Sequence, residues 1–253
     1  MNATSNRTAR KRVVVPAVVI SVAAVMIALT IFLQHSSPSS SVEPSAPASD
    51  VPPATVETVA PAPGEEAEEV DLTVFERRDE NDPLTAGSVD APVGLVIFSD
   101  YQCPFCARWS ADTLPVMMEY AERGELWIEY RDLPIFGAES ERAPLAAYAA
   151  ALQGKFWEYH EALYVDGDIR PKDQLATEAL TQLAVDLDLD RERFTADMTS
   201  EETAAAIATN AQLGFDLGAS STPVFLLGGA PIAGAQPTEV FVEVLETALA
   251  NQG

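Results

Sequence analysis

The chain has 253 residues, of which 39 are Asp or Glu and 15 are Lys or Arg, so its formal net charge at pH 7 is -24. This charge argues against nucleic acid as a partner, because phosphate binding needs clustered Lys and Arg, and it disfavours anionic lipid surfaces as well. The acidity otherwise indicates a solvated surface and carries little functional information.

Residues 1–12 form a basic segment, and residues 13–33 form an uncharged, mainly apolar run. As a helix this run would be about 31 Å long, close to the thickness of the hydrocarbon core of a bilayer. The next Lys or Arg after the basic segment is Arg77, so the positive-inside rule places residues 1–12 in the cytoplasm and the remainder outside. The sequence therefore predicts a transmembrane signal-anchor helix over 13–33 and a single-pass protein of the cell membrane whose main domain is extracytoplasmic.

A cleaved signal peptide is the alternative for the same segment, because it also combines basic residues with an apolar run. The apolar part of a signal peptide is usually about 7 to 15 residues long, and residues 34–38 contain no clear Ala-x-Ala cleavage site. We therefore favour an anchor over a signal peptide. Both alternatives place the main domain in a compartment where disulfides form and persist.

Residues 34–70 are rich in Ser, Pro, Ala and Glu and contain no aromatic residue. This composition predicts a disordered linker, with a reach of roughly 30 Å as a coil and about 100 Å as an extended polyproline helix. The folded domain is then expected over residues 71–253.

The first elements predicted in this domain are a strand, a helix and a second strand. Residues 93–99 are apolar and rich in Val, Ile and Phe, as in a buried strand, and residues 126–133 have a similar character. Between them a helix is expected to start at Cys103, with Pro104 at its first position and a kink or break at Pro115. Strand, helix and strand form a right-handed βαβ unit with parallel strands.

The second half of the domain predicts a helical block and then a return to strands. Residues 138–217 are rich in Ala, Leu and Glu with amphipathic runs, and residues 223–227 resume strand composition. A turn at 228–229 and a partner strand at 231–235 would complete a hairpin, and residues 238–250 predict a final amphipathic helix. The fold class expected is α/β, a thioredoxin-like fold with an inserted α-helical domain.

Cys103 and Cys106 are the only cysteines, and their C-x-x-C spacing places them at the junction of the first strand and helix. A zinc site would need about four ligands, which the chain does not offer, and a structural disulfide here would close almost no loop. The pattern therefore predicts a redox-active pair. The helix N-terminus would stabilise a thiolate at Cys103, making it the nucleophile, and Cys106 would resolve the mixed disulfide.

Four segments of the chain, taken in order, resemble the DsbA-like thioredoxin family, in particular its membrane-anchored bacterial branch. They are residues 98–106 (FSDYQCPFC), 131–137 (RDLPIFG), 154–160 (GKFWEYH) and 221–225 (STPVF). The resemblance runs from about residue 91 to the C-terminus.

The resemblance implies further site residues and partners. Pro223 would be a cis-proline that faces the cysteines, Thr222 would pair with client peptide through its backbone, and Pro104 and Phe105 would lie in the same client-binding region. The clients would be exported or unfolded proteins with cysteines. A membrane quinone-linked partner, DsbB-like or VKOR-like, would reoxidise the pair. The sequence indicates no metal and no diffusible cofactor.

One departure from the family affects proton transfer. Family members commonly carry a buried carboxylate six positions before the first cysteine, where this chain has Ile97. We considered Asp100 as a substitute proton relay for Cys106. His160 is expected to be a packed structural residue rather than a base.

Three aromatic residues, Tyr101, Phe105 and Trp109, were considered as an apolar rim for unfolded clients, although core positions are the usual place for such side chains. The function expected first is oxidation of cysteine pairs in exported proteins. The alternatives are a reductase or disulfide isomerase of the same fold, and a non-catalytic exported peptide-binding module.

Overall fold

The structure, a computed structural model, describes residues 71–252. The predicted cytoplasmic segment 1–12, membrane span 13–33 and linker 34–70 lie outside the described residues. Within residues 71–252, no helix is both long enough and apolar enough to cross a bilayer.

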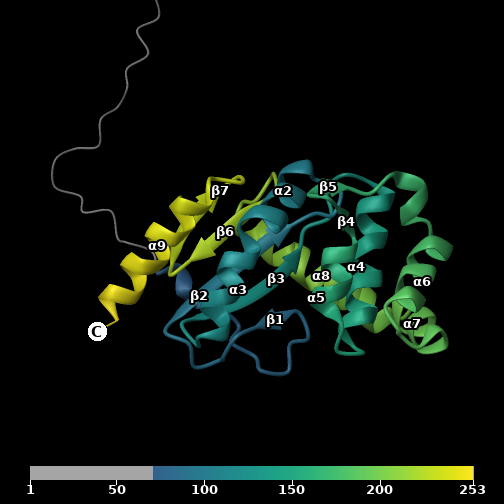
Figure 1. Cartoon of the computed structure of the whole chain (residues 1–253), viewed down its shortest axis with the longest axis horizontal. Helices are drawn as coiled ribbons and strands as arrows, with labels where there is room; N and C mark the ends of the chain where they lie inside the picture. The colour runs from purple at the N-terminus through teal and green to yellow at the C-terminus, as the bar shows by residue number, and fades with distance from the viewer. Residues whose placement is uncertain (1–70, 253) are drawn as a thin grey trace, which may run out of the picture. The chain divides into compact units, whose positions relative to one another are not determined.

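A five-stranded sheet with the strand order β1-β3-β2-β6-β7 forms the centre of the described domain (Figure 1). Strands β2 and β3 are parallel, and the other neighbouring pairs are antiparallel. The strands are β1 (Thr85–Ala86), β2 (Val93–Ser99), β3 (Leu126–Asp132), β6 (Val224–Leu227) and β7 (Ala230–Ala233).

The two central strands are the ones that the apolar runs predicted, and every residue of both is buried. Continuously apolar strands of a parallel pair need to be buried on both faces. Their register aligns Val93 with Leu126 at one end and Ser99 with Asp132 at the other. The carboxyl ends of β2 and β3 therefore meet at the same edge of the sheet.

Two helices connect these strands where the sequence predicted one helix with a kink or break. Helix α2 (Pro104–Asp112) ends before Thr113, and α3 (Leu114–Glu122) carries Pro115 in its first turn. Proline is well tolerated there because the first N–H groups of a helix have no intrahelical partner. Pro115 thus starts a second helix.

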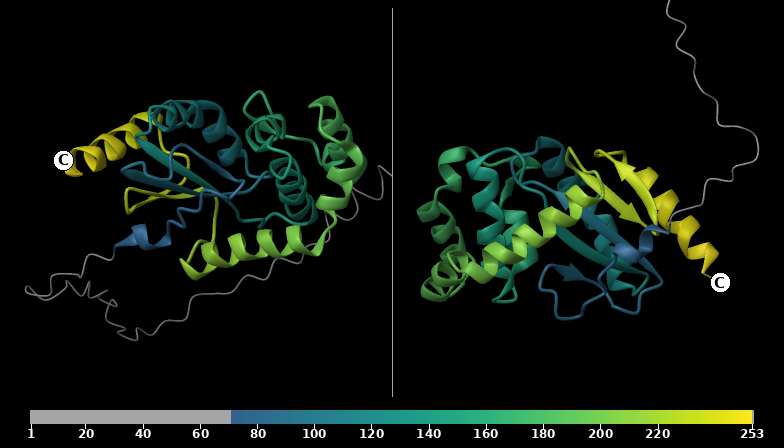
Figure 2. Two further views of the ribbon diagram at one scale, coloured as in Figure 1. Left: turned by 90° about the horizontal axis from the view of Figure 1, so that it is seen from below. Right: turned by 180° about the vertical axis from the view of Figure 1, so that it is seen from behind.

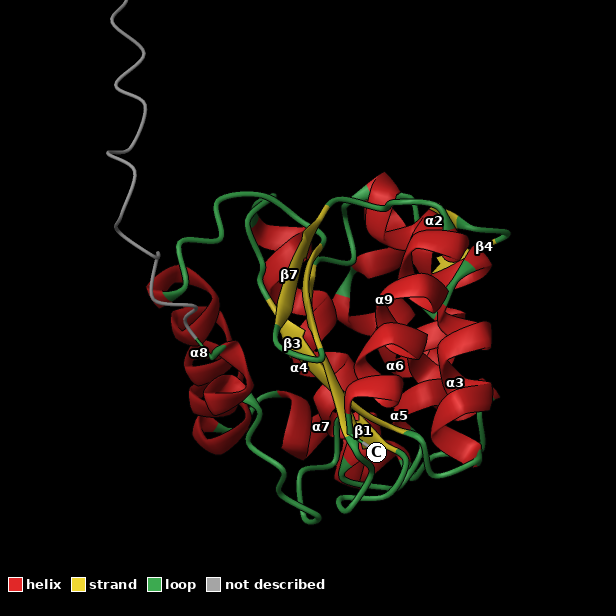
Figure 3. Ribbon diagram, turned by 90° about the vertical axis from the view of Figure 1, so that its left-hand side faces the viewer, coloured by secondary structure: helices red, strands yellow, loops and turns green. Residues whose placement is uncertain are grey.

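Helices cover both faces of the sheet. Leu95 and Ile97 of β2 share a core with residues of α2, α3 and the C-terminal helix α9 (Thr238–Asn251). Val96 and Phe98 point the other way and pack with residues of α8 (Glu201–Asp216) and of the short 3-10 helix η1 (Leu72–Phe75). Figures 2 and 3 show α8 on one side of the strands and α3 and α9 on the other.

The helical block lies beside the sheet in Figure 1 and occupies the residues that the sequence analysis assigned to it. Besides α8 it contains α4 (Ala138–Ala151), α5 (Phe156–Ala162), α6 (Thr177–Asp186) and α7 (Arg191–Met198). The block also holds a two-stranded hairpin, β4 (Tyr164–Val165) and β5 (Asp168–Ile169), and the 3-10 helix η2 (Lys172–Leu175). The sequence analysis did not predict these three short elements.

The segment from η1 to β2, which we call the N-terminal arm, is held against the sheet by buried charges. The sequence analysis did not predict the position of this arm. The Glu129 carboxylate, fully buried on β3, accepts hydrogen bonds from the backbone N–H groups of Arg77 and Arg78 at 3.1 and 2.7 Å. Glu129 also pairs with the buried Arg131 guanidinium at 2.6 Å, and Arg131 pairs with Asp82 at 2.9 Å. These contacts join β3 to two points of the arm.

We expect replacement of Arg131 by Met to lower the free energy of unfolding by about 3 to 5 kcal/mol, because it leaves the Glu129 charge buried without its cation. Urea denaturation of the soluble fragment measures this. The control is Arg191→Ala, which removes an exposed pair with Glu178 and should change stability little. Equal stability of the Arg131→Met variant and the unaltered protein would show that the network does not stabilise the fold.

Candidate active site

The turn between β2 and α2 positions the first cysteine at the beginning of the helix. Cys103 is the N-cap residue of α2, with extended backbone angles (φ -94°, ψ 115°), and Pro104 occupies the first turn. The Cys103 N–H donates to the Asp100 carbonyl at 3.1 Å, and the Cys103 carbonyl accepts from the Ala107 N–H at 3.1 Å. The thiol therefore lies at the positive end of the helix dipole, where the free N–H groups favour an anion.

Both cysteines are free thiols and both are buried, but their environments differ. The pKa of Cys103 is lowered to about 6, first by the hydrogen bond from the Cys106 thiol and further by the N–H groups of Cys106 and Phe105. Burial raises the pKa of Cys106, and the neighbouring Cys103 raises it further. The pair therefore carries one thiolate, on Cys103, and one thiol, on Cys106.

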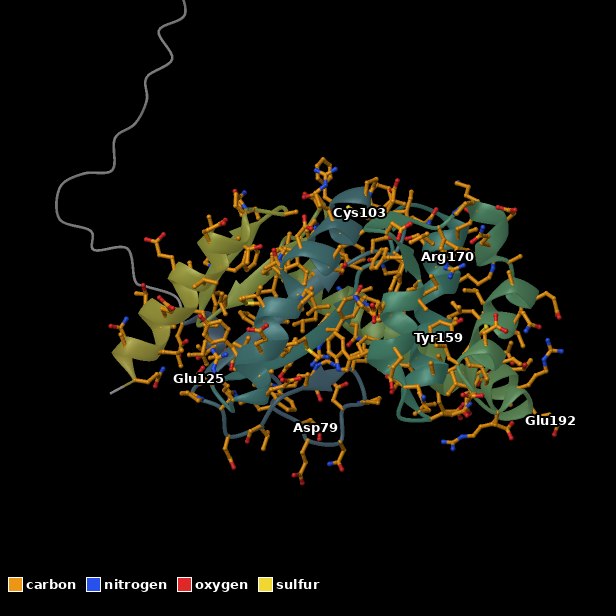
Figure 4. The ribbon with its side chains drawn as sticks, in the orientation of Figure 1. Asp79, Cys103, Glu125, Tyr159, Arg170 and Glu192 are labelled. Carbon is orange, nitrogen blue, oxygen red and sulfur yellow. The ribbon has the colours of Figure 1, made fainter. Side chains whose placement is uncertain are left out.

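Thr222 and Pro223 face this pair from the loop before β6. The Cys103 Sγ atom lies 3.3 Å from the Thr222 carbonyl oxygen, and the peptide bond between Thr222 and Pro223 is cis. Both residues are buried, while Pro104 and Phe105 are exposed at the start of α2. Figure 4 shows Cys103 at an edge of the molecule. The structure thus brings together the cysteines and the four residues that the sequence analysis assigned to client binding.

Asp100 has a different environment from the one a proton relay needs. Its buried carboxylate accepts from the backbone N–H groups of Gln102 and Ile135, both at 2.7 Å, and from the Ser140 hydroxyl. These donors come from the turn before α2, the loop after β3 and the start of α4. No hydrogen bond joins the Asp100 carboxylate to either cysteine among the described residues, so its position indicates a structural role.

His160 lies inside an aromatic cluster, as expected for a structural residue. Its Nδ1 atom is 3.1 Å from the Tyr101 hydroxyl, and its Nε2 atom is 3.2 Å from the Ser110 hydroxyl. Burial lowers the pKa of His160 to about 3, so the imidazole remains neutral at physiological pH.

The proposed aromatic rim was wrong for two of its three members. Tyr101, in the turn before α2, and Trp109, on the buried face of α2, are 0% and 2% exposed and belong to the core. Phe105 alone is exposed, at 57%. Phe136, in the loop that Asp100 holds through Ile135, is a second large apolar side chain with high exposure, at 49%.

Asp132 is a candidate site residue that the sequence analysis missed. It ends β3 opposite Ser99, is 1% exposed, and has no hydrogen-bond partner at either carboxylate oxygen. Burial raises the pKa of Asp132 to about 8, with a further contribution from the negative charge of Asp100. The signal in the sequence was an acidic residue at the end of a buried apolar strand, within segments that we used only for the strand prediction and for the family resemblance.

Within residues 71–252, no group of three or more His, Cys, Asp or Glu side chains is arranged to hold a metal ion. The chemistry that the described site offers is thiol exchange at Cys103.

Comparison with known proteins identifies the family of the chain. A family model described as thioredoxin matches residues 79–247. The chain is 30% identical over 168 residues to a protein named Na(+)/H(+) antiporter NhaA 3 from Salinispora tropica, covering 65% of this chain and 24% of that protein. It thus spans about a quarter of the length of that relative. It is 24% identical over 148 residues to a probable disulfide bond formation protein D from Bacillus cereus, covering 56% of this chain and 68% of that protein.

Two solved structures show the same fold. A thioredoxin-like oxidoreductase from Silicibacter pomeroyi is 28% identical, with a TM-score of 0.57 over 67% of this chain and 98% of that one. The thiol-disulfide exchange protein alpha-DsbA2 from Wolbachia pipientis is 20% identical, with a TM-score of 0.59 over 71% of this chain and 94% of that one. The chain therefore belongs to the thioredoxin family.

Proposed function

We propose that this protein introduces disulfides into cysteine-containing client proteins outside the cytoplasm, using a redox-active Cys103–Cys106 disulfide. The observation that carries this proposal is the asymmetry of the pair, in which the pKa of Cys103 is lowered and that of Cys106 is raised. Stabilising the thiolate favours the reduced protein, and a pair with a stabilised reduced form is a strong oxidant.

The reaction runs in two exchange steps. A client thiolate attacks Cys103 Sγ in the disulfide, and the electron pair of the broken S–S bond goes to Cys106, which takes up a proton. A second client thiolate then attacks the client sulfur of the mixed disulfide and releases Cys103 as a thiolate. The client loses two electrons and gains a disulfide, and the enzyme retains the two electrons as a dithiol.

Reoxidation of the dithiol requires an electron acceptor, and we assign this role to a membrane quinone-linked partner, DsbB-like or VKOR-like. The support is the predicted membrane span at residues 13–33. An anchor there would place the domain outside the cytoplasm and keep it within reach of such a partner.

Client binding is assigned to the surface around Cys103. The Thr222 carbonyl, next to Pro223, lies against Cys103 Sγ. Pro104 and Phe105 are exposed at the start of α2, and Phe136 is exposed in the loop after β3. Exposed aromatic side chains of this size suit apolar segments of unfolded proteins.

The nucleophile assignment predicts which cysteine reacts with iodoacetamide. Alkylation of Cys103 should rise with pH to half its maximum near pH 6, because only the thiolate reacts and its pKa is lowered. Cys106 should stay unlabelled in the same range, which peptide mass spectrometry can establish, with Cys103→Ser as the control for Cys106 alone. Two cysteines that both react only near the ordinary thiol pKa of 9.0 would contradict the assignment.

The oxidising role predicts a reduction potential near that of DsbA, about -120 mV, when the soluble fragment is equilibrated against glutathione. A value near the thioredoxin potential of about -270 mV would instead identify a reductase. Catalytic amounts of the oxidised protein should also form disulfides in a reduced client, and Cys103→Ser should abolish this activity. If client oxidation were the same with the Cys103→Ser variant as with the unaltered protein, the cysteine pair would not be the catalyst. The non-catalytic binding module would then be the remaining alternative.

The proposed topology predicts that a C-terminal epitope tag on the full chain is digested when protease is added to intact protoplasts. A cytoplasmic protein serves as the control and should survive. Protection of the tag until the membrane is lysed would place the domain in the cytoplasm and contradict the proposal.

A further inference from the structure

Arg108, an exposed residue of the active-site helix α2, is a cation without a counter-charge. Every other Lys and Arg side chain of residues 71–252 forms an ion pair or a hydrogen bond with the domain. Arg108 takes part in none of these contacts within the same residues. Acidic partners are plentiful in a chain with a net charge of -24, so a cation that has none is an exception that needs a reason.

The Arg108 guanidinium contacts an aromatic ring instead of an acid. Its central carbon lies 5.8 Å from the centre of the Phe105 ring, within the range of a cation–π contact. Asp112 is exposed one turn further along α2, and no ion pair joins it to Arg108. A helical pair with the cation before the acid is the weaker of the two orders, which accounts for this choice. The charge of Arg108 therefore lies toward the Cys103 end of the helix.

The cation–π contact places this charge where a client must pass. Phe105 stands between the two cysteines in the chain and is 57% exposed. The part of α2 from Cys103 to Arg108 is about 7.5 Å long, which equals about two residues of an extended peptide. A client whose cysteine bonds to Cys103 Sγ therefore has residues within reach of both the Phe105 ring and the Arg108 guanidinium.

A carboxylate of the client is the partner that fits Arg108. The guanidinium is not among the groups that contribute most to the lowered pKa of Cys103. An anionic lipid surface is a poor fit as well, because its recognition usually needs a cluster of roughly four to eight Lys or Arg. A guanidinium binds a single carboxylate well, since its paired N–H donors match the two carboxylate oxygens.

We propose that Arg108 and Phe105 form a specificity site for client cysteines that have an Asp or Glu within about two residues. This inference rests on the proposed function and names the client class of the same site. The client carboxylate binds the Arg108 guanidinium, and the apolar residues beside it cover the Phe105 ring. The contact orients the client thiolate toward Cys103 Sγ and takes no part in the exchange of electrons or protons.

Single-turnover oxidation of dithiol peptides by the oxidised soluble fragment measures this specificity. Two peptides differ only in having Glu or Gln at the second position after the first cysteine, and a second pair has the same change at the second position before it. Rate constants are measured at about 0.15 M salt, where charges more than about 8 Å apart are largely screened. The unaltered protein is compared with Arg108→Gln, and the reaction with uncharged 2-mercaptoethanol is the reference for the cysteine pair of each variant.

The Glu-to-Gln ratio of rate constants should be about two- to fivefold higher for the unaltered protein than for Arg108→Gln, as expected for an exposed ion pair. Dividing one ratio by the other cancels the intrinsic reactivity of each peptide and the general negative charge of the domain. Arg108→Glu should lower the Glu-to-Gln ratio further, since it replaces attraction by repulsion. The matched control is Arg191→Gln, an exposed Arg of α7, which should have the same Glu-to-Gln ratio as the unaltered protein.

Equal Glu-to-Gln ratios for the unaltered protein and Arg108→Gln at both peptide positions would overturn the specificity site while leaving the proposed function intact. If the unaltered fragment then sediments with phosphatidylglycerol vesicles and Arg108→Gln does not, the anion is a lipid headgroup. A loss in Arg108→Gln that is the same for 2-mercaptoethanol and for every peptide would show that Arg108 acts on Cys103, and would also overturn the site. An oxidised protein that exchanges with none of these thiols would overturn the proposed function as well.

Discussion

The Asp100 carboxylate is the contact on which the geometry of the site depends. Three donors from separate segments converge on it: the N–H of Gln102, the N–H of Ile135 and the hydroxyl of Ser140. A buried carboxylate is costly unless it is hydrogen-bonded, so each donor also restrains its own segment. The turn that presents Cys103, the loop that carries Phe136 and the start of the helical block are thereby fixed to one another. The insertion is connected to the thioredoxin-like part at the redox site itself.

This restraint also explains why Asp100 is poorly suited to proton transfer. A proton relay must change its protonation state during each reaction cycle, whereas Asp100 holds three segments together by accepting hydrogen bonds with both oxygens. Protonating it would weaken those contacts at the moment when Cys103 must stay in place. Asp132 has no such contacts to lose. The negative charge of Asp100 raises the pKa of Asp132, so the structural acid helps to set the properties of the other one.

The parts that could be predicted from sequence are those in which local pattern and tertiary packing agree. The apolar runs of β2 and β3, the start of α2 at Cys103 and Pro104, and the break near Pro115 follow from composition and helix-capping rules.

The roles of the acidic residues could not be predicted in this way. Asp100 is close to Cys103 along the chain, but its carboxylate is directed to Ile135 and Ser140. Asp132 is remote from Ser99 in sequence, and only the register of β3 with β2 places the two residues opposite each other. The arm before β2 was missed because β1 has two residues and its anchoring partner, Glu129, is more than fifty positions away in the chain.

Strand β3 shows how a buried strand can carry two carboxylic acids and an arginine without losing the fold. Neighbouring residues point to opposite faces, so Glu129 and Arg131 share one face and Asp132 lies on the other. Glu129 and Arg131 compensate each other and are completed by Asp82 and two backbone N–H groups. Asp132 has no partner on its own face, and the remaining way to reduce the cost of burial is to hold a proton at neutral pH.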